Sequence, residues 1–234
     1  MSSTYLKRDI SATGNQKKWT FSAWIKNTEP TASGDRFIFS ANNEHSGGGN
    51  YSSLMITATA ALRYYDYSGG GTDNELVTSR LLRDPSGWYH IVVHYDSANS
   101  TANDRIKFYI NGVQETSFST RSNPSQNYNS YVENNYRFFI GTQTDSTGSA
   151  SDFDGIMSHL HFANDQLYAP TVFGSTDSAT GEWNINVNPS VTYGTNGFFM
   201  FKDDNSLNDD SGQGNNFTLG AGTLTKTEDN PSNV

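Results

Sequence analysis

The chain of 234 residues contains no cysteine and no long apolar run. Without cysteine it can have no disulfide framework, zinc–thiolate site or thiol nucleophile. No stretch approaches the length of a membrane span. The N-terminal sequence MSSTYLKRDISATG also lacks the apolar core of a signal peptide. We therefore expect a soluble protein that is made in a cytoplasm without a signal peptide and inserts into no membrane.

Positive charge is scarce as well. The chain has 15 Lys and Arg residues against 24 Asp and Glu residues, a formal net charge of −9, and no basic run. Phosphate binding needs clustered lysine and arginine side chains. Nucleic acid is therefore not an expected partner.

Helix signals are nearly missing, and the apolar residues alternate instead. The segment 168–173, with Pro170 near its start, is the one stretch that suggests a helical turn. Between His90 and Asp96, by contrast, Ile91, Val93 and Tyr95 fall on one face, the period of a β-strand. With 34% hydrophobic and 13% aromatic residues, the composition indicates a globular all-β protein with almost no helix.

The same pattern places strands along most of the chain. Asn111–Gly112 supplies the two positive φ angles of a type I′ hairpin turn. In WTFSAWIK, Trp19, Phe21, Ala23 and Ile25 share a predicted core face, and Trp24 is expected on the other face beneath a covering segment. We predict strands at 3–8, 18–26, 36–41, 51–57, 61–67, 75–82, 88–95, 105–111, 113–119, 136–142, 153–163 and 196–202.

The character of the chain changes near residue 175. We expect the main sandwich at residues 1–175 and an extension at 176–222 that packs on or completes it. Residues 223–234 are predicted to be a poorly ordered tail, because little apolar remains there to anchor the chain.

Several segments together resemble a known family. In order they are WTFSAWIK, RFIFSA, LRDPSGWYHIVVHYD, RIKFYINGVQ, FFIGTQ and DFDGIMSHLHFANDQLYAPTVFG. They resemble the laminin-G-like, concanavalin A-like jelly roll, and more narrowly the LamG-like domains in tail-fibre and other virion proteins of marine phages and cyanophages. The resemblance implies an antiparallel two-sheet β-sandwich, whose members mostly bind glycans or other proteins.

Tyrosines are the candidate ligand-binding residues. A sugar's apolar face stacks on an aromatic ring while nearby polar groups hydrogen-bond its hydroxyls. Tyr64, Tyr65 and Tyr67 lie together before a glycine-rich loop, and Tyr128 and Tyr131 lie in an asparagine-rich stretch. Consecutive residues on a strand point to opposite faces, so Tyr64 and Tyr65 cannot share one. The alternative is that these rings pad a sandwich edge or a subunit contact.

Asp203, Asp204, Asp209 and Asp210 are the candidate metal ligands. Calcium takes six to eight oxygen ligands, and a glycine-rich loop can turn several carboxylates inward. The alternative is a solvated loop of Asx turns. We expect no cofactor to be required, with calcium as the one candidate ion.

The paired histidines offer a second metal hypothesis. His90 and His94 share a strand face, as do His159 and His161. The alternative reading is that they hydrogen-bond to neighbours on a half-solvated face.

An enzyme is not expected. Retaining glycoside hydrolysis needs two carboxylates about 5 Å apart. Asp152 and Asp154 have the spacing of strand neighbours on one face, but aspartate at the start of a strand is usually turn chemistry.

These observations together predict a non-enzymatic surface module of a phage virion, in a tail fibre or other appendage. It would be made in the host cytoplasm and attach to the host through a surface glycan or protein. In a fibre it would form a homo-oligomer, with a trimer expected. One alternative is an assembly or capsid-decorating module that contacts other virion proteins and has no host ligand; another is a polysaccharide-degrading enzyme.

Overall fold

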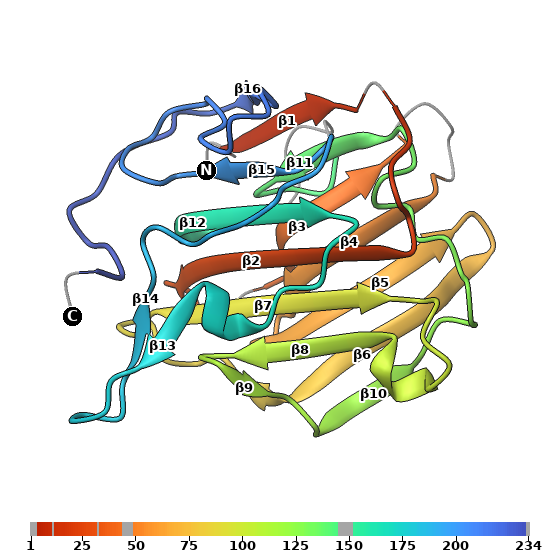
Figure 1. The fold of residues 1–234 in the computed structure, drawn as a ribbon, viewed down its shortest axis with the longest axis horizontal. Helices are drawn as coiled ribbons and strands as arrows, with labels where there is room; N and C mark the ends of the chain where they lie inside the picture. The colour runs from red at the N-terminus through yellow and green to blue at the C-terminus, as the bar shows by residue number, and fades with distance from the viewer. Residues whose placement is uncertain (1–3, 11, 32, 44–48, 145–151, 233–234) are drawn as a thin grey trace.

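Two antiparallel sheets pack face to face in the computed structural model, which describes residues 4–10, 12–31, 33–43, 49–144 and 152–232 (Figure 1). In spatial order, the eight-stranded sheet contains β10 (Phe118–Ser122), β6 (Gly71–Leu81), β5 (Ala61–Ser68), β4 (Tyr51–Ile56), β3 (Arg36–Asn42), β11 (Arg137–Ile140), β1 (Tyr5–Asp9) and β16 (Thr218–Ala221). The six-stranded sheet contains β15 (Phe198–Met200), β12 (Gly155–Asn164), β2 (Lys18–Asn27), β7 (Tyr89–Asp96), β8 (Ile106–Ile110) and β9 (Val113–Gln114). The expected antiparallel β-sandwich is confirmed.

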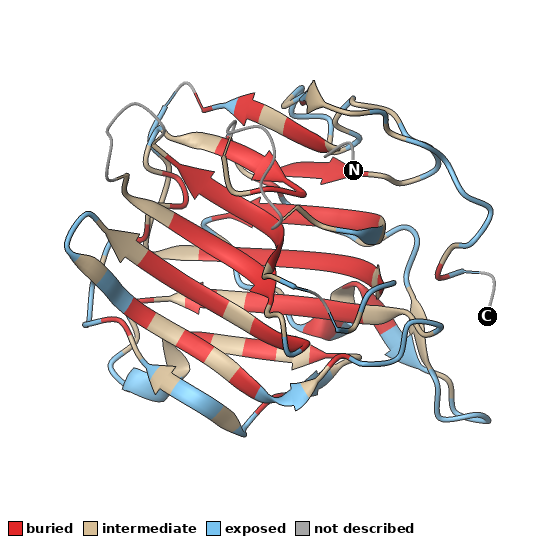
Figure 2. Cartoon of the chain, turned by 180° about the vertical axis from the view of Figure 1, so that it is seen from behind, coloured by how far each residue is buried: buried red, intermediate tan, exposed pale blue. Residues whose placement is uncertain are grey.

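Alternation along β2 shows how the sequence builds the core between the sheets. Trp19, Phe21, Ala23 and Ile25 are almost completely buried and belong to the main apolar cluster, as predicted. Trp24 points to the opposite face of the same strand, where its ring stacks on His90 with centroids 4.9 Å apart. Seen from behind, buried residues run along the central strands of the eight-stranded sheet, and exposed ones gather toward β10 (Figure 2).

A third, two-stranded sheet covers part of the outer face of the six-stranded sheet (Figure 1). It consists of β13 (Gly174–Thr176) and β14 (Trp183–Ile185) and follows the 3-10 turn η2 (Pro170–Val172). Trp183 from this hairpin contacts His90 of β7, so the cover over Trp24 and His90 is the chain's own segment. The helical turn predicted around Pro170 is confirmed as η2, and a second 3-10 turn, η1 (Ala102–Asp104), lies before β8.

The segment predicted as one strand at 113–119 is divided. Val113 and Gln114 form β9 in the six-stranded sheet, whereas Phe118 begins β10 in the eight-stranded sheet. The chain crosses between the layers at Glu115, which is 6% exposed and whose carboxylate pairs with Arg80 at 2.6 Å. The expectation of a continuous strand was wrong: residues 115–117 connect the two sheets, and the buried Glu115 carboxylate lies at this crossing.

The C-terminal part of the chain supplies one strand to each large sheet. β15 pairs with β12, and β16 pairs with β1. In the segment predicted as a poorly ordered tail, the Asp229 carboxylate accepts hydrogen bonds from Lys26 Nζ at 2.5 Å and Trp88 Nε1 at 3.0 Å. Residues 233 and 234 of that segment lie outside the described residues. Among the described residues, no helix has the length and apolar character needed to cross a membrane.

Candidate functional site

Strand β5 sorts the predicted tyrosines onto two faces of the eight-stranded sheet. Leu62 and Tyr64 point into the core, whereas Arg63, Tyr65 and Tyr67 point outward. Tyr64 is 2% exposed, its hydroxyl donates to Asp66 Oδ1 at 2.8 Å, and burial raises its pKa. The structure therefore brings Tyr65 and Tyr67 together on the outer face and separates Tyr64 from them.

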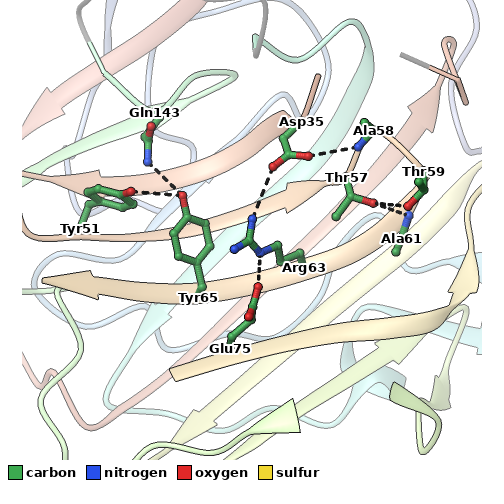
Figure 3. A network of polar contacts seen from close by, with 10 residues as sticks. All are labelled: Asp35, Tyr51, Thr57, Ala58, Thr59, Ala61, Arg63, Tyr65, Glu75 and Gln143. Carbon is green, nitrogen blue, oxygen red and sulfur yellow. Dashed lines mark hydrogen bonds and ion pairs between the residues drawn. The ribbon is translucent and has the colours of Figure 1, made fainter. Parts of the chain in front are cut away.

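A third tyrosine, which the sequence did not single out, completes the outer group. Tyr51 on β4 lies directly opposite Tyr67, and their rings stack with centroids 4.9 Å apart and planes 16° from parallel. Tyr65 meets the Tyr51 ring edge-on at 5.5 Å, and its hydroxyl receives a hydrogen bond from Gln143 Nε2 at 3.2 Å (Figure 3). We call Tyr51, Tyr65 and Tyr67 the tyrosine step. Tyr51 and Tyr67 are only half-buried, so their rings are accessible.

Arg63 lies beside the tyrosine step and is held from both sides (Figure 3). Its guanidinium pairs with Glu75 at 2.6 Å and with Asp35 at 3.4 Å, and it lies 4.2 Å from the centre of the Tyr65 ring. Asp35 is itself fixed because its other oxygen accepts the Ala58 backbone N–H at 3.1 Å. The positive charge is thus both positioned and compensated.

The centre of the outer face is covered by the chain after β11. Ser40 Oγ donates to the Thr142 carbonyl at 2.9 Å, and Asn42 Nδ2 donates to the Gln143 carbonyl at 3.1 Å. Ser40 is fully buried beneath this cover. The rim on which Tyr51 and Tyr67 lie is outside this cover and is partly exposed, as are the outward residues Glu75 and Val77 of β6.

A small cavity of about 100 Å³ opens farther along the same rim. We call it the rim hollow, and its lining residues are Asp9, Ile10, Asn42, Asn43, Asn135, Tyr136 and Arg137. Asn42 links it to the tyrosine step, because it lies opposite Tyr51 on one side and Arg137 on the other. Arg137 is paired with Asp9 through Nε at 2.6 Å and Nη2 at 3.3 Å.

The two remaining predicted tyrosines are tied to Asp73. Tyr128 and Tyr131 both donate their hydroxyls to Asp73 Oδ2, at 2.8 and 3.3 Å. Tyr131 also stacks on Tyr136 with centroids 5.9 Å apart, so it lies behind one wall of the rim hollow. Burial is the main cause that raises the pKa of both Tyr128 and Tyr131. Their hydroxyls therefore attach the loop that contains them to Asp73, and the Tyr131 ring packs against Tyr136 in the wall of the rim hollow.

The acidic loop shows mainly turn chemistry. Asp209 accepts four hydrogen bonds, from Phe199 N, Ser211 N, Ser211 Oγ and Asn215 N, at 2.7–2.9 Å. Asp204 Oδ1 accepts the Ser206 N–H at 2.7 Å, and burial raises the pKa of Asp210. Asp203 is exposed. Nowhere in the described residues do three His, Cys, Asp or Glu side chains form a group that could hold a metal ion. Calcium at these four aspartates stays a prediction.

The paired histidines have partners from the chain itself. His90 is fully buried, and its ring nitrogens contact Ser22 Oγ at 2.9 Å and Trp183 Nε1 at 3.0 Å. His161 stacks on Phe199 at 3.9 Å. These contacts match hydrogen-bonded and packed side chains rather than ligands that face an open site.

Four large apolar side chains are exposed among the described residues. Val113 lies on β9 and Leu219 on β16, whereas Leu167 and Val187 lie in connections outside the strands.

Comparison with known proteins identifies the fold family. A laminin-G family model, described as the concanavalin A-like lectin/glucanases superfamily, matches residues 2–173. No curated protein matches the chain. Among solved structures, a heptameric SAP-like pentraxin from Limulus polyphemus shares 13% identity at a TM-score of 0.49, over 96% of this chain and 90% of the pentraxin.

Two carbohydrate-bound structures are also similar to the chain. The Ruminococcus gnavus IT-sialidase CBM40 bound to α2,3-sialyllactose shares 16% identity at a TM-score of 0.44, over 66% of this chain and 85% of its own. Domain 4 of the arabinanase AbnA from Geobacillus stearothermophilus, in complex with arabinotriose, shares 17% identity at 0.45, over 70% and 67%. Because these identities are low, the family assignment depends on the family model.

Proposed function

The chain belongs to the concanavalin A-like lectin/glucanases superfamily, and we propose that it is a non-catalytic protein that binds glycans at the rim of its eight-stranded sheet. The observation that supports this proposal is the stacked pair of Tyr51 and Tyr67. A half-exposed ring pair on a rigid sheet offers the flat apolar surface on which a pyranose ring stacks.

Polar groups next to the step suit the hydroxyls of a sugar. Asn42, Asn43 and Asn135 line the rim hollow, and amides both donate and accept hydrogen bonds; Asn42 Nδ2 already donates to the Gln143 carbonyl, which leaves its oxygen as the group for a sugar hydroxyl. A binding site of few polar groups around an apolar surface is the usual composition of a ligand pocket. The tyrosine step would thus supply contact area, and the rim hollow would supply orientation.

The carboxylates beside the tyrosine step, Asp35 and Glu75, are placed in a way that favours glycan binding over glycan hydrolysis. Asp35 and Glu75 both contact the Arg63 guanidinium, whereas hydrolysis needs two carboxyl groups placed on either side of a glycosidic bond. Asp152 and Asp154 precede β12 and lie outside the tyrosine step and the rim hollow.

We place this binding on the surface of a phage virion, where it would attach a tail fibre or other appendage to the host. The support is the resemblance between the chain's strand segments and the LamG-like domains of phage structural proteins. The net charge of −9 gives no general attraction to an anionic cell surface, so attachment would depend on local contacts at the rim.

A glycan array followed by isothermal titration tests the proposal. Tyr51→Ala and Tyr67→Ala should each weaken glycan binding by about tenfold or more, since each removes one ring of the stack. Tyr109→Ala is the matched control, because Tyr109 is a half-buried strand tyrosine on the other sheet whose ring packs at an angle of 56° against His94.

Three results would contradict the proposal. A trimer in solution without any glycan binding would favour the assembly or capsid-decorating module instead. Release of reducing ends from an oligosaccharide would indicate an enzyme. Equal loss of binding in the Tyr109→Ala variant would show that the effect of the step variants is not local.

A further inference from the structure

Within the proposed function, on which this inference depends, we infer that the rim takes a neutral oligosaccharide of about four linked rings, laid across the strands. An acidic sugar or a single terminal ring would fit the same rim less well. Two features of the rim favour such a ligand: the register of five strands and the pairing of the charged groups.

The register aligns the rim residues in one row. Tyr67 lies opposite Tyr51, Tyr51 opposite Asn42, Asn42 opposite Arg137, and Arg137 opposite Asp9. Directly paired residues share a face of the sheet. Neighbouring strands are about 4.8 Å apart, so a row across five strands is about 19 Å long, roughly the length of four linked pyranose rings.

The two ends of the row offer different contacts. Stacked rings lie at the β5–β4 end, and the amide-lined hollow lies at the β3–β11–β1 end. A single ring covers about one strand spacing, so it can contact Tyr51 and Asn42 together but cannot extend from Tyr67 to Asp9, which lie four spacings apart. An oligosaccharide that extends along the row contacts both. Affinity is therefore expected to rise with the number of linked rings until the row is filled.

Charge pairing determines the class of sugar. Arg63 already contacts Glu75 and Asp35, and Arg137 already contacts Asp9 through two nitrogens. A carboxylate of an acidic sugar would bind well only to a guanidinium whose fork is available. Here it would have to displace a carboxylate of the protein, within a chain whose net charge is −9. Neutral hydroxyl groups meet no such competition.

Oligosaccharide ladders test the inference. We would titrate the full chain with cello-, malto- and manno-oligosaccharides of one to six rings, and with oligogalacturonates as the acidic counterpart. For the neutral ladder that binds, affinity should increase by about tenfold or more from two rings to four and then level off. The oligogalacturonate of the same length should bind about tenfold more weakly.

A charge variant provides an independent test. Glu75→Gln removes one partner of Arg63 and should raise the affinity for oligogalacturonate by about threefold or more. Glu182→Gln is the matched control, because it removes the same charge from an exposed position on the distant β13–β14 hairpin and should leave that affinity unchanged.

The outcomes separate this inference from the proposed function. If a monosaccharide binds as tightly as the longer oligosaccharides, or if the oligogalacturonates bind more tightly than the neutral sugars, the inference is wrong, while glycan binding at the rim still stands. If none of the oligosaccharides binds and the array shows no bound glycan, both the inference and the proposed function are wrong.

Discussion

Trp183 donates its indole N–H to Nδ1 of His90 at 3.0 Å. Since an indole nitrogen can only donate, Nδ1 must be the unprotonated nitrogen of the buried imidazole. The proton is then on Nε2, which faces Ser22 Oγ at 2.9 Å. Burial lowers the pKa of His90 to about 3, so the ring is neutral across the physiological range. This one hydrogen bond from the β13–β14 hairpin thus determines which ring nitrogen of His90 carries the proton.

Replacing this indole by a smaller ring should destabilise the protein. Trp183→Phe keeps an aromatic ring but leaves the buried Nδ1 of His90 without a donor, at a cost of about 1–3 kcal/mol in the free energy of unfolding. Urea denaturation measures the loss. Trp88→Phe is the control, since its indole N–H donates to Asp229 at an exposed site and its removal should cost much less. Equal losses in the two variants would argue against the role of His90.

Gly112 should tolerate no side chain. It has a φ of +77°, and a Cβ atom there would lie 2.4 Å from the Trp183 ring. Gly214 has a φ of +74° with nothing within 4 Å, so it carries the backbone strain without the clash. Gly214→Ala should therefore cost about 1 kcal/mol in thermal or urea unfolding, and Gly112→Ala clearly more. Equal costs would mean that the β13–β14 hairpin moves aside freely.

Acid should destabilise the fold below about pH 6.5. Burial lowers the pKa of His90 to about 3 and that of His159 to about 4, from 6.5. The unfolded chain then binds protons that the folded chain cannot, so the free energy of unfolding falls as pH drops through 6.5. Each of these histidines should contribute a loss of about 2 kcal/mol between pH 6.5 and pH 5. Urea unfolding at a series of pH values would measure the decline. Because Glu133 and Asp66 oppose it, the decisive protein is the Glu133→Gln variant, and a midpoint in that variant that is constant from pH 7.5 to 5 would contradict the prediction.

Two buried carboxyls should partly offset that loss. Burial raises the pKa of Glu133 from 4.5 to about 7 and that of Asp66 from 3.8 to about 6. Each therefore stabilises the fold when protonated, and this contribution is lost as pH rises through the folded pKa. Glu133→Gln should accordingly make the decline between pH 7 and pH 5 steeper. Glu228→Gln, an exposed change of the same kind, should leave it unaltered.

Asp73 should hold the loop of residues 123–135, which contains Tyr128 and Tyr131, in a single conformation. Its carboxylate accepts hydrogen bonds from Ser68, Tyr128 and Tyr131. Asp73→Ala should speed hydrogen exchange and limited proteolysis in residues 123–135, with a loss of about 1 kcal/mol in stability. Asp104→Ala, which removes an exposed carboxylate paired with Lys107, serves as the control and should leave exchange in that loop unchanged.

Period-two alternation was sufficient to predict most of the sandwich. It placed Trp19, Phe21, Ala23 and Ile25 in the core and gave a strand close to each observed one up to β12. It could not divide 113–119, because an alternating run looks the same whether its residues stay in one sheet or cross to another. The short strands β13, β14 and β16 were missed, since three or four residues are too few to show a period.

The candidate site shows a different limit of sequence reasoning. Alternation alone requires Tyr64 and Tyr65 to face opposite ways, but it cannot say which of them faces the core. Tyr51 was not singled out because its importance comes from its position opposite Tyr67, and that pairing depends on the register between β4 and β5. Likewise, the rim hollow draws Asp9, Asn42 and Arg137 from three strands that are distant in sequence.

The position of β1 between β11 and β16 has a mechanical consequence. In the antiparallel pair of β1 and β16, the first residue of one strand, Tyr5, lies opposite the last residue of the other, Ala221. A tensile load that draws the segments before Tyr5 and after Ala221 apart is therefore applied at the same end of the pair. In this unzipping geometry the hydrogen bonds between β1 and β16 break one after another, whereas in shear geometry they would carry the force together. Once the contacts of Asp229 with Lys26 and Trp88 have broken, the load therefore opens the pair of β1 and β16 one hydrogen bond at a time.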